Sequence, residues 1–174
     1  MSDDMTDTIG AGSGGHVGPA IDPELDLTLE RVIRAPREAV FRAWTDPERF
    51  AQWFLPAPMR LRVERFEPIA GGALVTSMSD DGETWMPHLD ALFLRVDAGE
   101  RIVFTNAISA DLRPQDAQPV PMAAEIVLAA HPEGTDYRAT VRHRAPADRD
   151  RHAELGFAEG WGAVTAQLAA LVEG

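Results

Sequence analysis

The 174-residue sequence contains neither cysteine nor lysine. Without cysteine it can form no disulfide and no thiolate metal site, and we expect a cytoplasmic protein. No apolar run approaches the ~20 residues of a membrane-spanning helix. The first residues also lack the basic and apolar regions of a signal peptide. The sequence therefore predicts no membrane insertion.

Positive charge is scarce. Only 16 basic residues, all of them arginine, stand against 28 acidic ones, which gives a formal net charge of −12. A surface of this sign repels phosphate groups, so we expect no nucleic-acid partner. The acidic balance is otherwise typical of a surface that keeps a protein in solution.

Several catalytic motifs are also missing. The sequence has no Gly-x-Ser-x-Gly, no P-loop, no Gly-x-Gly-x-x-Gly after a strand and no His-Glu-x-x-His. These absences disfavour a nucleophile-based hydrolase, a nucleotide enzyme and a zinc protease. We predict neither a metal nor a cofactor.

Residues 1–23 contain five glycines and two prolines and no arginine. Such a segment cannot bury enough apolar surface to fold, so we expect a flexible, acidic and glycine-rich tail. Residues 24–174 form one domain in this interpretation, with no internal repeat. A chain of about 150 residues buries roughly 70% of its unfolded surface, which is enough for one core.

The start of the domain is the most informative stretch. Residues 27–33 have the apolar pattern of a strand, and Ala35-Pro36 ends it, because proline suits the first turn of a helix. Apolar residues then recur at helical spacing until Thr45-Asp46-Pro47, which predicts the cap of a second short helix. That helix ends in two aromatic residues, Trp53 and Phe54.

The rest of the domain alternates between strand patterns and turns. We expect strands at about 60–67, 73–78, 83–96, 101–106, 122–130 and 137–144, with Pro87 at a bulge or an edge. Residues 107–121 predict a long surface loop, which could cover the mouth of a pocket. A single long helix is expected over 148–172, because large apolar residues recur there at intervals of 4, 3, 4 and 3 residues. Consecutive hairpins and a final helix indicate an antiparallel α+β fold.

This order resembles the START-like (Bet v 1-like, SRPBCC) superfamily and, within it, the domain named after the activator of the Hsp90 ATPase. The residues that carry the resemblance are Ala35-Pro36, Val40-Phe41, Trp44, Thr45-Asp46-Pro47, Trp53-Phe54, Gly71-Gly72, Leu94-Arg95-Val96, Arg101-Ile102-Val103-Phe104 and Gly160-Trp161. The resemblance implies a helix-grip fold, in which a curved six- to seven-stranded antiparallel sheet packs on a long C-terminal helix. Two short helices would lie between strands 1 and 2.

A helix-grip fold can enclose a cavity between its sheet and its C-terminal helix, and a few residues are candidates to line it. Trp53, Trp85, Phe157 and Trp161 are the aromatic candidates, with His88 beside them, because indoles provide a large apolar surface and one N–H. Each aromatic residue could equally be part of a filled core. Gly160 and Gly162 flank Trp161, and we expect their missing Cβ atoms to let the helix lie close to the sheet.

Catalytic candidates are few. His88 and Asp90 lie two residues apart on a predicted strand, so their side chains would share a face and could act in general-base chemistry. Arg142 could hold a ligand carboxylate if it turned inward, or form an ordinary cross-strand ion pair with Glu125. His143 and His152 are expected in solvent or at the rim of the pocket.

Three functions remain open on the sequence. We favour the binding of a small, mainly hydrophobic molecule in a cavity between the sheet and the C-terminal helix. The second is a polyketide cyclase, aromatase or hydratase type of enzyme that uses His88, Asp90 and Arg142. The third is an interaction with an Hsp90-type chaperone, which ranks last because the partner domain of the eukaryotic co-chaperone is absent. A homodimer is the default assembly.

Overall fold

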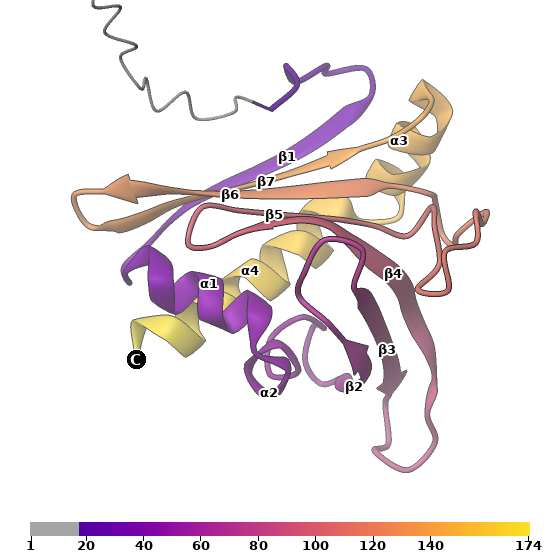
Figure 1. Ribbon diagram of the computed structural model, residues 1–174, viewed down its shortest axis with the longest axis horizontal. Helices are drawn as coiled ribbons and strands as arrows, with labels where there is room; N and C mark the ends of the chain where they lie inside the picture. Colours follow the sequence, from indigo (N-terminus) through magenta and orange to yellow (C-terminus); the bar gives the residue numbers. More distant parts are fainter. Residues whose placement is uncertain (1–17) are drawn as a thin grey trace, which may run out of the picture.

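The computed structural model describes residues 18–174 and has the expected helix-grip architecture (Figure 1). Seven antiparallel strands form one curved sheet in the order β1-β7-β6-β5-β4-β3-β2. The elements are β1 (Asp26–Ile33), α1 (Arg37–Thr45), α2 (Pro47–Phe50), β2 (Arg60–Phe66), β3 (Ala73–Ser79), β4 (Met86–Asp97), β5 (Arg101–Thr105), β6 (Ala123–His131), β7 (Gly134–Arg142), α3 (Pro146–Glu154) and α4 (Phe157–Glu173). Helix α4 crosses the concave side of the sheet and packs against α1 and β1.

The two short helices begin where the prolines and the cap predict. Pro36 has φ −61° and ψ 150° and precedes α1. Asp46 caps α2, because its Oδ1 accepts hydrogen bonds from the N–H groups of Glu48 at 2.9 Å and Arg49 at 3.4 Å. These bonds satisfy two of the free N–H groups at the helix start. The prediction of two short helices between the first two strands is confirmed, but α2 ends at Phe50, before the aromatic pair Trp53 and Phe54 that was expected to end it.

The sheet is built from hairpins that join β2 to β7 in turn, while β1 returns to pair with β7. The register between β3 and β4 shifts between Thr76 and Ser77, so that Thr76 lies opposite Leu89 and Ser77 lies opposite Pro87. His88 is the extra residue of this bulge. The bulge predicted at Pro87 is therefore present, since a proline cannot donate to the ladder.

The C-terminal segment differs from the single helix that we expected. Gly156 has φ 92°, a left-handed value that glycine adopts easily, and it separates α3 from α4. The two helices meet at an angle of 65°. No single helix in residues 18–174 is long and apolar enough to cross a membrane, and only this bent pair passes on length and composition.

Aromatic residues fill the interior beneath α1 and α2. Trp44 is fully buried, and its ring centroid lies 5.8 Å from that of Phe50 and 4.8 Å from that of Trp53. The Trp53 Nε1–H donates to the carbonyl of Ala43 at 2.9 Å, so this buried indole is satisfied within the core. We call this group the aromatic cluster; its members are Trp44, Phe50, Trp53, Phe66, Phe93 and Phe104.

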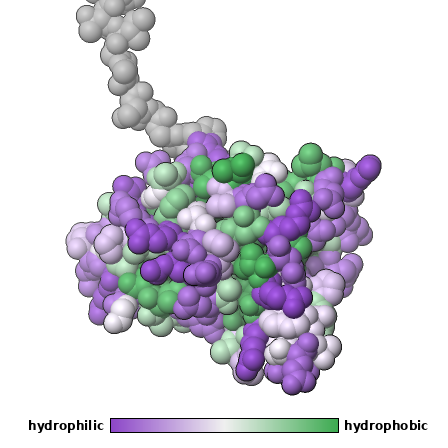
Figure 2. Space-filling model, turned by 60° about the horizontal axis from the view of Figure 1, so that its bottom comes forward, coloured by the Kyte–Doolittle hydropathy of each residue, from purple (hydrophilic) through white to green (hydrophobic). Residues whose placement is uncertain are grey.

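The first described residues lie on the other face of the sheet. The Arg142 Nη2–H donates to the carbonyl of Pro19 at 3.0 Å, which holds the chain there before β1 begins. The part of the predicted tail at residues 1–17 lies outside the described residues. On the face turned toward the reader in Figure 2, hydrophobic residues reach the surface in separate groups among hydrophilic ones.

Candidate functional site

A cavity of about 250 Å³ lies between the first half of α4 and the sheet, and we call it the α4 cavity. Its lining contains no aspartate, glutamate or arginine, and most of the lining side chains are apolar. The residues are Phe54, Leu55, Pro56, His88, Leu89, Asn106, Gln118, Pro119, Met122, Gly160, Trp161 and Val164. This uncharged and mostly apolar lining suits a molecule with few polar groups.

Helix α4 forms one wall of this cavity with Gly160, Trp161 and Val164. A Cβ atom at Gly160 would meet no atom within 4 Å, and the same holds at Gly162. The expectation that these glycines bring the helix close to the sheet is therefore wrong. At Gly160 the missing side chain leaves room in the cavity instead.

The segment after α2 forms a second wall, and Gln167 of α4 fixes it in place. The Gln167 Nε2 donates to the carbonyls of Trp53 and Leu55, both at 2.9 Å, and its Oε1 accepts from the Ala57 N–H at 2.8 Å. One side chain thus satisfies three backbone groups of an irregular segment. Phe54, Leu55 and Pro56 lie within this clamped stretch and line the cavity.

The loop over residues 107–121 closes the remaining side. Asn106 is buried, and its side chain donates to the carbonyl of Val120 at 3.1 Å and accepts from the Met122 N–H at 2.8 Å. The Gln115 Nε2 donates to the carbonyls of Asn106 at 2.8 Å and Asp90 at 2.9 Å. Gln118 and Pro119 of this loop line the cavity. The loop expected at a pocket mouth is thus tied to the sheet beside the pocket.

His88 is the titratable residue of the α4 cavity. Its Nδ1 lies 2.9 Å from the Oγ1 of Thr76, and its ring lies against that of Phe54 with centroids 6.3 Å apart. Burial lowers the pKa of His88 below its ordinary value of 6.5, so the imidazole is neutral at neutral pH. A neutral imidazole offers one N–H donor and one acceptor.

A second depression of about 410 Å³ adjoins the cavity. The two share His88, Leu89, Asn106 and Gln118 in their linings. Asp90 lines only this second depression, and its Oδ1 accepts a hydrogen bond from the Ala110 N–H at 2.8 Å. The carboxylate of Asp90 is thus engaged by the loop, and the bulge gives His88 a separate partner, Thr76.

The four aromatic residues predicted to line a cavity lie in three different environments: the cavity lining, the core and the surface beside Arg62. Trp161 lines the α4 cavity, where its ring centroid lies 5.6 Å from that of Phe157. Trp53 and Phe157 do not line this cavity; both are buried in the core. Trp85 lies outside the cavity, where the guanidinium of Arg62 stacks 4.5 Å from its ring centroid. Of the predicted set, only His88 and Trp161 lie in the lining.

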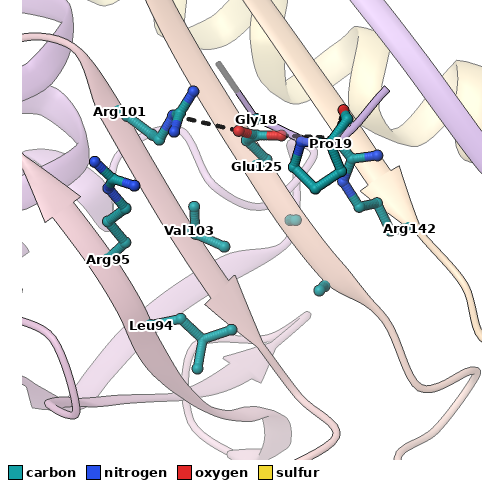
Figure 3. A pocket seen from close by; sticks show the side chains of 10 residues that line it. Gly18, Pro19, Leu94, Arg95, Arg101, Val103, Glu125 and Arg142 are labelled. Carbon is teal, nitrogen blue, oxygen red and sulfur yellow. Dashed lines mark hydrogen bonds and ion pairs between the residues drawn. The ribbon is translucent and has the colours of Figure 1, made fainter. Parts of the chain in front are cut away.

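Arg142 belongs to the face of the sheet that is turned away from α4 (Figure 3). Its Nη2 lies 2.8 Å from Glu125 Oε2, and its Nη1 lies 3.0 Å from Asp26 Oδ2. The predicted cross-strand pair with Glu125 is present, so Arg142 is not available to the α4 cavity. Arg142 therefore does not join His88 and Asp90, which both line the second depression, so only two of the three catalytic candidates share one site.

His143 and His152 also differ from expectation, because they form a pair rather than sitting in solvent. His143 is 6% exposed, and its Nε2 lies 2.9 Å from His152 Nδ1. The other ring nitrogen of His143 lies 2.8 Å from the carbonyl of Leu25. Burial, together with the charge that His143 can carry, lowers the pKa of His152 to about 4. This pair joins the start of β1, the end of β7 and α3.

Sequence reasoning missed several lining residues, among them Phe54, Leu89, Met122 and Gln118. The run of paired aromatics after α2 was the one signal available for Phe54. No group of three or more histidine, aspartate or glutamate side chains in residues 18–174 is placed to hold a metal ion.

A family model described as "Activator of Hsp90 ATPase homolog 1-like protein" matches residues 34–173. A crystal structure of a protein from Nitrosomonas europaea is 38% identical, covers 88% of this chain and 97% of its own, and has a TM-score of 0.77. A crystal structure of a protein from Chromobacterium violaceum is 29% identical. The match covers 86% of this chain and 98% of that protein's chain, with a TM-score of 0.67. No curated protein matches.

Solved structures of lower identity show the same fold. The solution structure of a protein from Aeromonas hydrophila, named as similar to the same activator, is 22% identical and covers 86% of this chain and 92% of its own. Its TM-score is 0.61. The fold of this chain therefore recurs in this solved structure.

Proposed function

Because this chain belongs to the activator of Hsp90 ATPase homolog 1-like family, we propose that it uses its helix-grip fold to bind a small, mainly hydrophobic molecule in the α4 cavity. The observation that carries the proposal is the uncharged lining of a cavity of about 250 Å³. Fold alone does not determine function, so the chemistry of this lining is what supports the proposal.

The lining favours apolar ligands on energetic grounds. Phe54, Met122 and Trp161 offer large apolar surfaces, and each buried methylene of a ligand contributes about 0.8 kcal/mol. A charged ligand would lose its hydration and meet no aspartate, glutamate or arginine in the lining. We expect dissociation constants of roughly micromolar to millimolar for small apolar compounds, which corresponds to about −8 to −4 kcal/mol.

Two walls of the cavity are fixed before any ligand arrives. Gln167 holds the segment that contains Phe54, and Asn106 holds the end of the loop that contains Pro119. A wall that is already ordered costs a ligand little conformational entropy on binding. This arrangement supports a binding site rather than an incidental gap in the core.

The first experiment is native mass spectrometry of freshly purified protein, which would detect a retained small molecule. The second is a thermal shift screen with lipids, polyketides and aromatic compounds. A ligand that binds only the native state raises the melting temperature. We expect at least one compound of the apolar set to raise it in a concentration-dependent manner.

Two glycine variants locate the binding. Gly160→Leu places a side chain in the α4 cavity, whereas Gly162→Leu adds the same group on the same helix outside the lining. We expect Gly162→Leu to keep the ligand-induced shift and Gly160→Leu to lose it. Equal shifts in both variants, or no shift with any compound, would contradict the proposal.

A further inference from the structure

His88 allows the class of ligand to be narrowed, because its partner Thr76 determines where its proton lies. This threonine is 1% exposed, and its hydroxyl makes one hydrogen bond among the described residues, to His88 Nδ1. A buried hydroxyl proton without an acceptor is costly. The Thr76 hydroxyl therefore donates to Nδ1, because in the reverse arrangement its own proton would have no acceptor.

This assignment determines the other ring nitrogen. A neutral imidazole carries one proton, so when Nδ1 accepts, the proton lies on Nε2. Burial lowers the pKa of His88, which keeps the ring neutral at neutral pH. The ring therefore presents an N–H donor at Nε2.

The Nε2 donor has no hydrogen-bond partner within residues 18–174, and it is not among the buried side-chain atoms that lack one. It is therefore accessible, and His88 lines both the α4 cavity and the adjoining depression. An unsatisfied donor in an otherwise apolar wall rewards a ligand that brings an acceptor.

The size of the ligand follows from the volume. An apolar cavity of about 150 Å³ holds benzene. A cavity of about 250 Å³ therefore has room for a molecule of about ten non-hydrogen atoms. Asn106 uses its side-chain amide on Val120 and Met122, which leaves His88, Gln118 and the indole N–H of Trp161 as the polar groups of the lining that a ligand can engage.

We propose that the α4 cavity selects a neutral, compact molecule with a carbonyl or ether oxygen, and that this oxygen accepts a hydrogen bond from His88 Nε2–H. The inference rests on the proposed function, since it concerns the same cavity. It excludes carboxylates and amines as preferred ligands. Thr76 acts as a positioning residue, because its hydroxyl sets which nitrogen carries the proton.

The test compares two probes of matched shape, 1-tetralone and tetralin, which differ by one carbonyl oxygen. Isothermal titration calorimetry gives the dissociation constant of each for the wild type and for His88→Phe. The quantity of interest is the ratio of the tetralin constant to the tetralone constant. We expect this ratio to fall about fivefold in His88→Phe, the factor of one neutral hydrogen bond, while tetralin still binds.

Two further variants test the role of Thr76. Thr76→Val should lower the ratio by less than His88→Phe does, because the imidazole can still carry its proton on Nε2, and Thr76→Ser should keep the wild-type ratio, because serine retains the hydroxyl. A carboxylate of the same skeleton, tetralin-1-carboxylate, should bind at least tenfold more weakly than tetralin. A long-range ¹H–¹⁵N spectrum of the wild type should show the His88 proton on Nε2, which requires no variant to fold.

The outcomes separate the two proposals. If tetralin binds and the ratio does not change in His88→Phe, or if the spectrum places the proton on Nδ1, this inference is overturned and the proposed function stands. If neither probe binds to the wild type, the proposed function fails for this size of ligand and the inference fails with it. Tighter binding of the carboxylate than of tetralin would also overturn the inference.

Discussion

The space between the sheet and the helices is filled at one end and open at the other. Under α1, Trp44 contacts the rings of Phe50, Trp53 and Phe54, and all but the last are fully buried or nearly so. Beside the first half of α4, the corresponding space holds Trp161 and the bare backbone of Gly160, and a cavity remains. The same sheet supports both regions.

The difference shows that the filled region under α1 stabilises the fold, while the region beside α4 leaves space for a ligand. The aromatic cluster anchors α1 and α2, so that the segment after α2 can stand as a cavity wall. The second half of α4 is anchored in the same way by Leu168 and Ala169, which are fully buried. The first half of the helix is then free to carry glycines at a cost of helix propensity.

The largest effect should come from exchanging tryptophan for alanine in each region. Trp44→Ala removes a fully buried indole with four aromatic neighbours and should lower the free energy of unfolding by about 3–5 kcal/mol. Trp161→Ala removes a partly buried indole beside space that already exists, and should cost about 1–2 kcal/mol while weakening ligand binding. Chemical denaturation of both variants measures the difference. Equal losses of stability would contradict the contrast between the two regions.

Removal of the Gln167 clamp should have the next largest effect. Gln167→Ala leaves two carbonyls and one N–H of the cavity wall without partners, and we expect a loss of about 1–3 kcal/mol together with weaker ligand binding. Gln52→Ala is the matched control, because its amide bonds only to Glu48 within the α2 region. If both variants behave alike in denaturation and in calorimetry, the clamp does not position the wall.

The His143–His152 pair, near the start of α4, should make stability depend on pH. The pKa of His152 is about 4 in the folded chain, against an ordinary value of 6.5 for an unfolded chain, so the unfolded chain binds a proton first as the pH falls. The free energy of unfolding is therefore highest above pH ~6.5 and falls progressively toward pH ~4. We expect a total loss of about 1–2 kcal/mol, because the pair is partly screened by solvent. Denaturation curves at several pH values should show this slope, and His152→Asn should flatten it. His131→Asn, a histidine outside the pair, should leave the slope unchanged.

The smallest predicted effect distinguishes the two glycines of α4. Gly160→Ala and Gly162→Ala should each stabilise the helix by up to about 1 kcal/mol, because neither new Cβ meets an atom within 4 Å. Thermal denaturation measures this gain. Only Gly160→Ala should also weaken ligand binding, since Gly162 does not line the cavity. A gain in stability at Gly162 alone would contradict the prediction, because a Cβ at either position meets no atom within 4 Å.

Most of the fold could be predicted from the sequence because local signals agreed with one another. Pro36, Asp46 and the alternating strands each specify a boundary or a face through local chemistry, and the structure places them accordingly. The break at Gly156 was missed, because a glycine inside an apolar helical pattern does not reveal a positive φ until the two helices pack. Local periodicity alone could not separate α3 from α4.

The site was less predictable for a physical reason. Spacing along a helix or strand shows that Trp53 and Trp161 are apolar positions, but not which of them borders empty space. The β-bulge at His88 also gave it a partner of its own, Thr76, which strict alternation does not predict. A cavity is set by what several distant segments leave unfilled, and no single segment encodes it.

The most direct test of the α4 cavity uses the four tryptophans as reporters. Their indole N–H signals can be followed in a ¹H–¹⁵N correlation spectrum while tetralin is added to the wild-type protein. If a small apolar molecule enters the cavity, the Trp161 signal should shift most, and the Trp85 signal, which lies outside it, should stay in place. A titration that leaves the Trp161 signal unmoved at saturating tetralin, or that moves the Trp85 signal instead, would contradict binding in the α4 cavity.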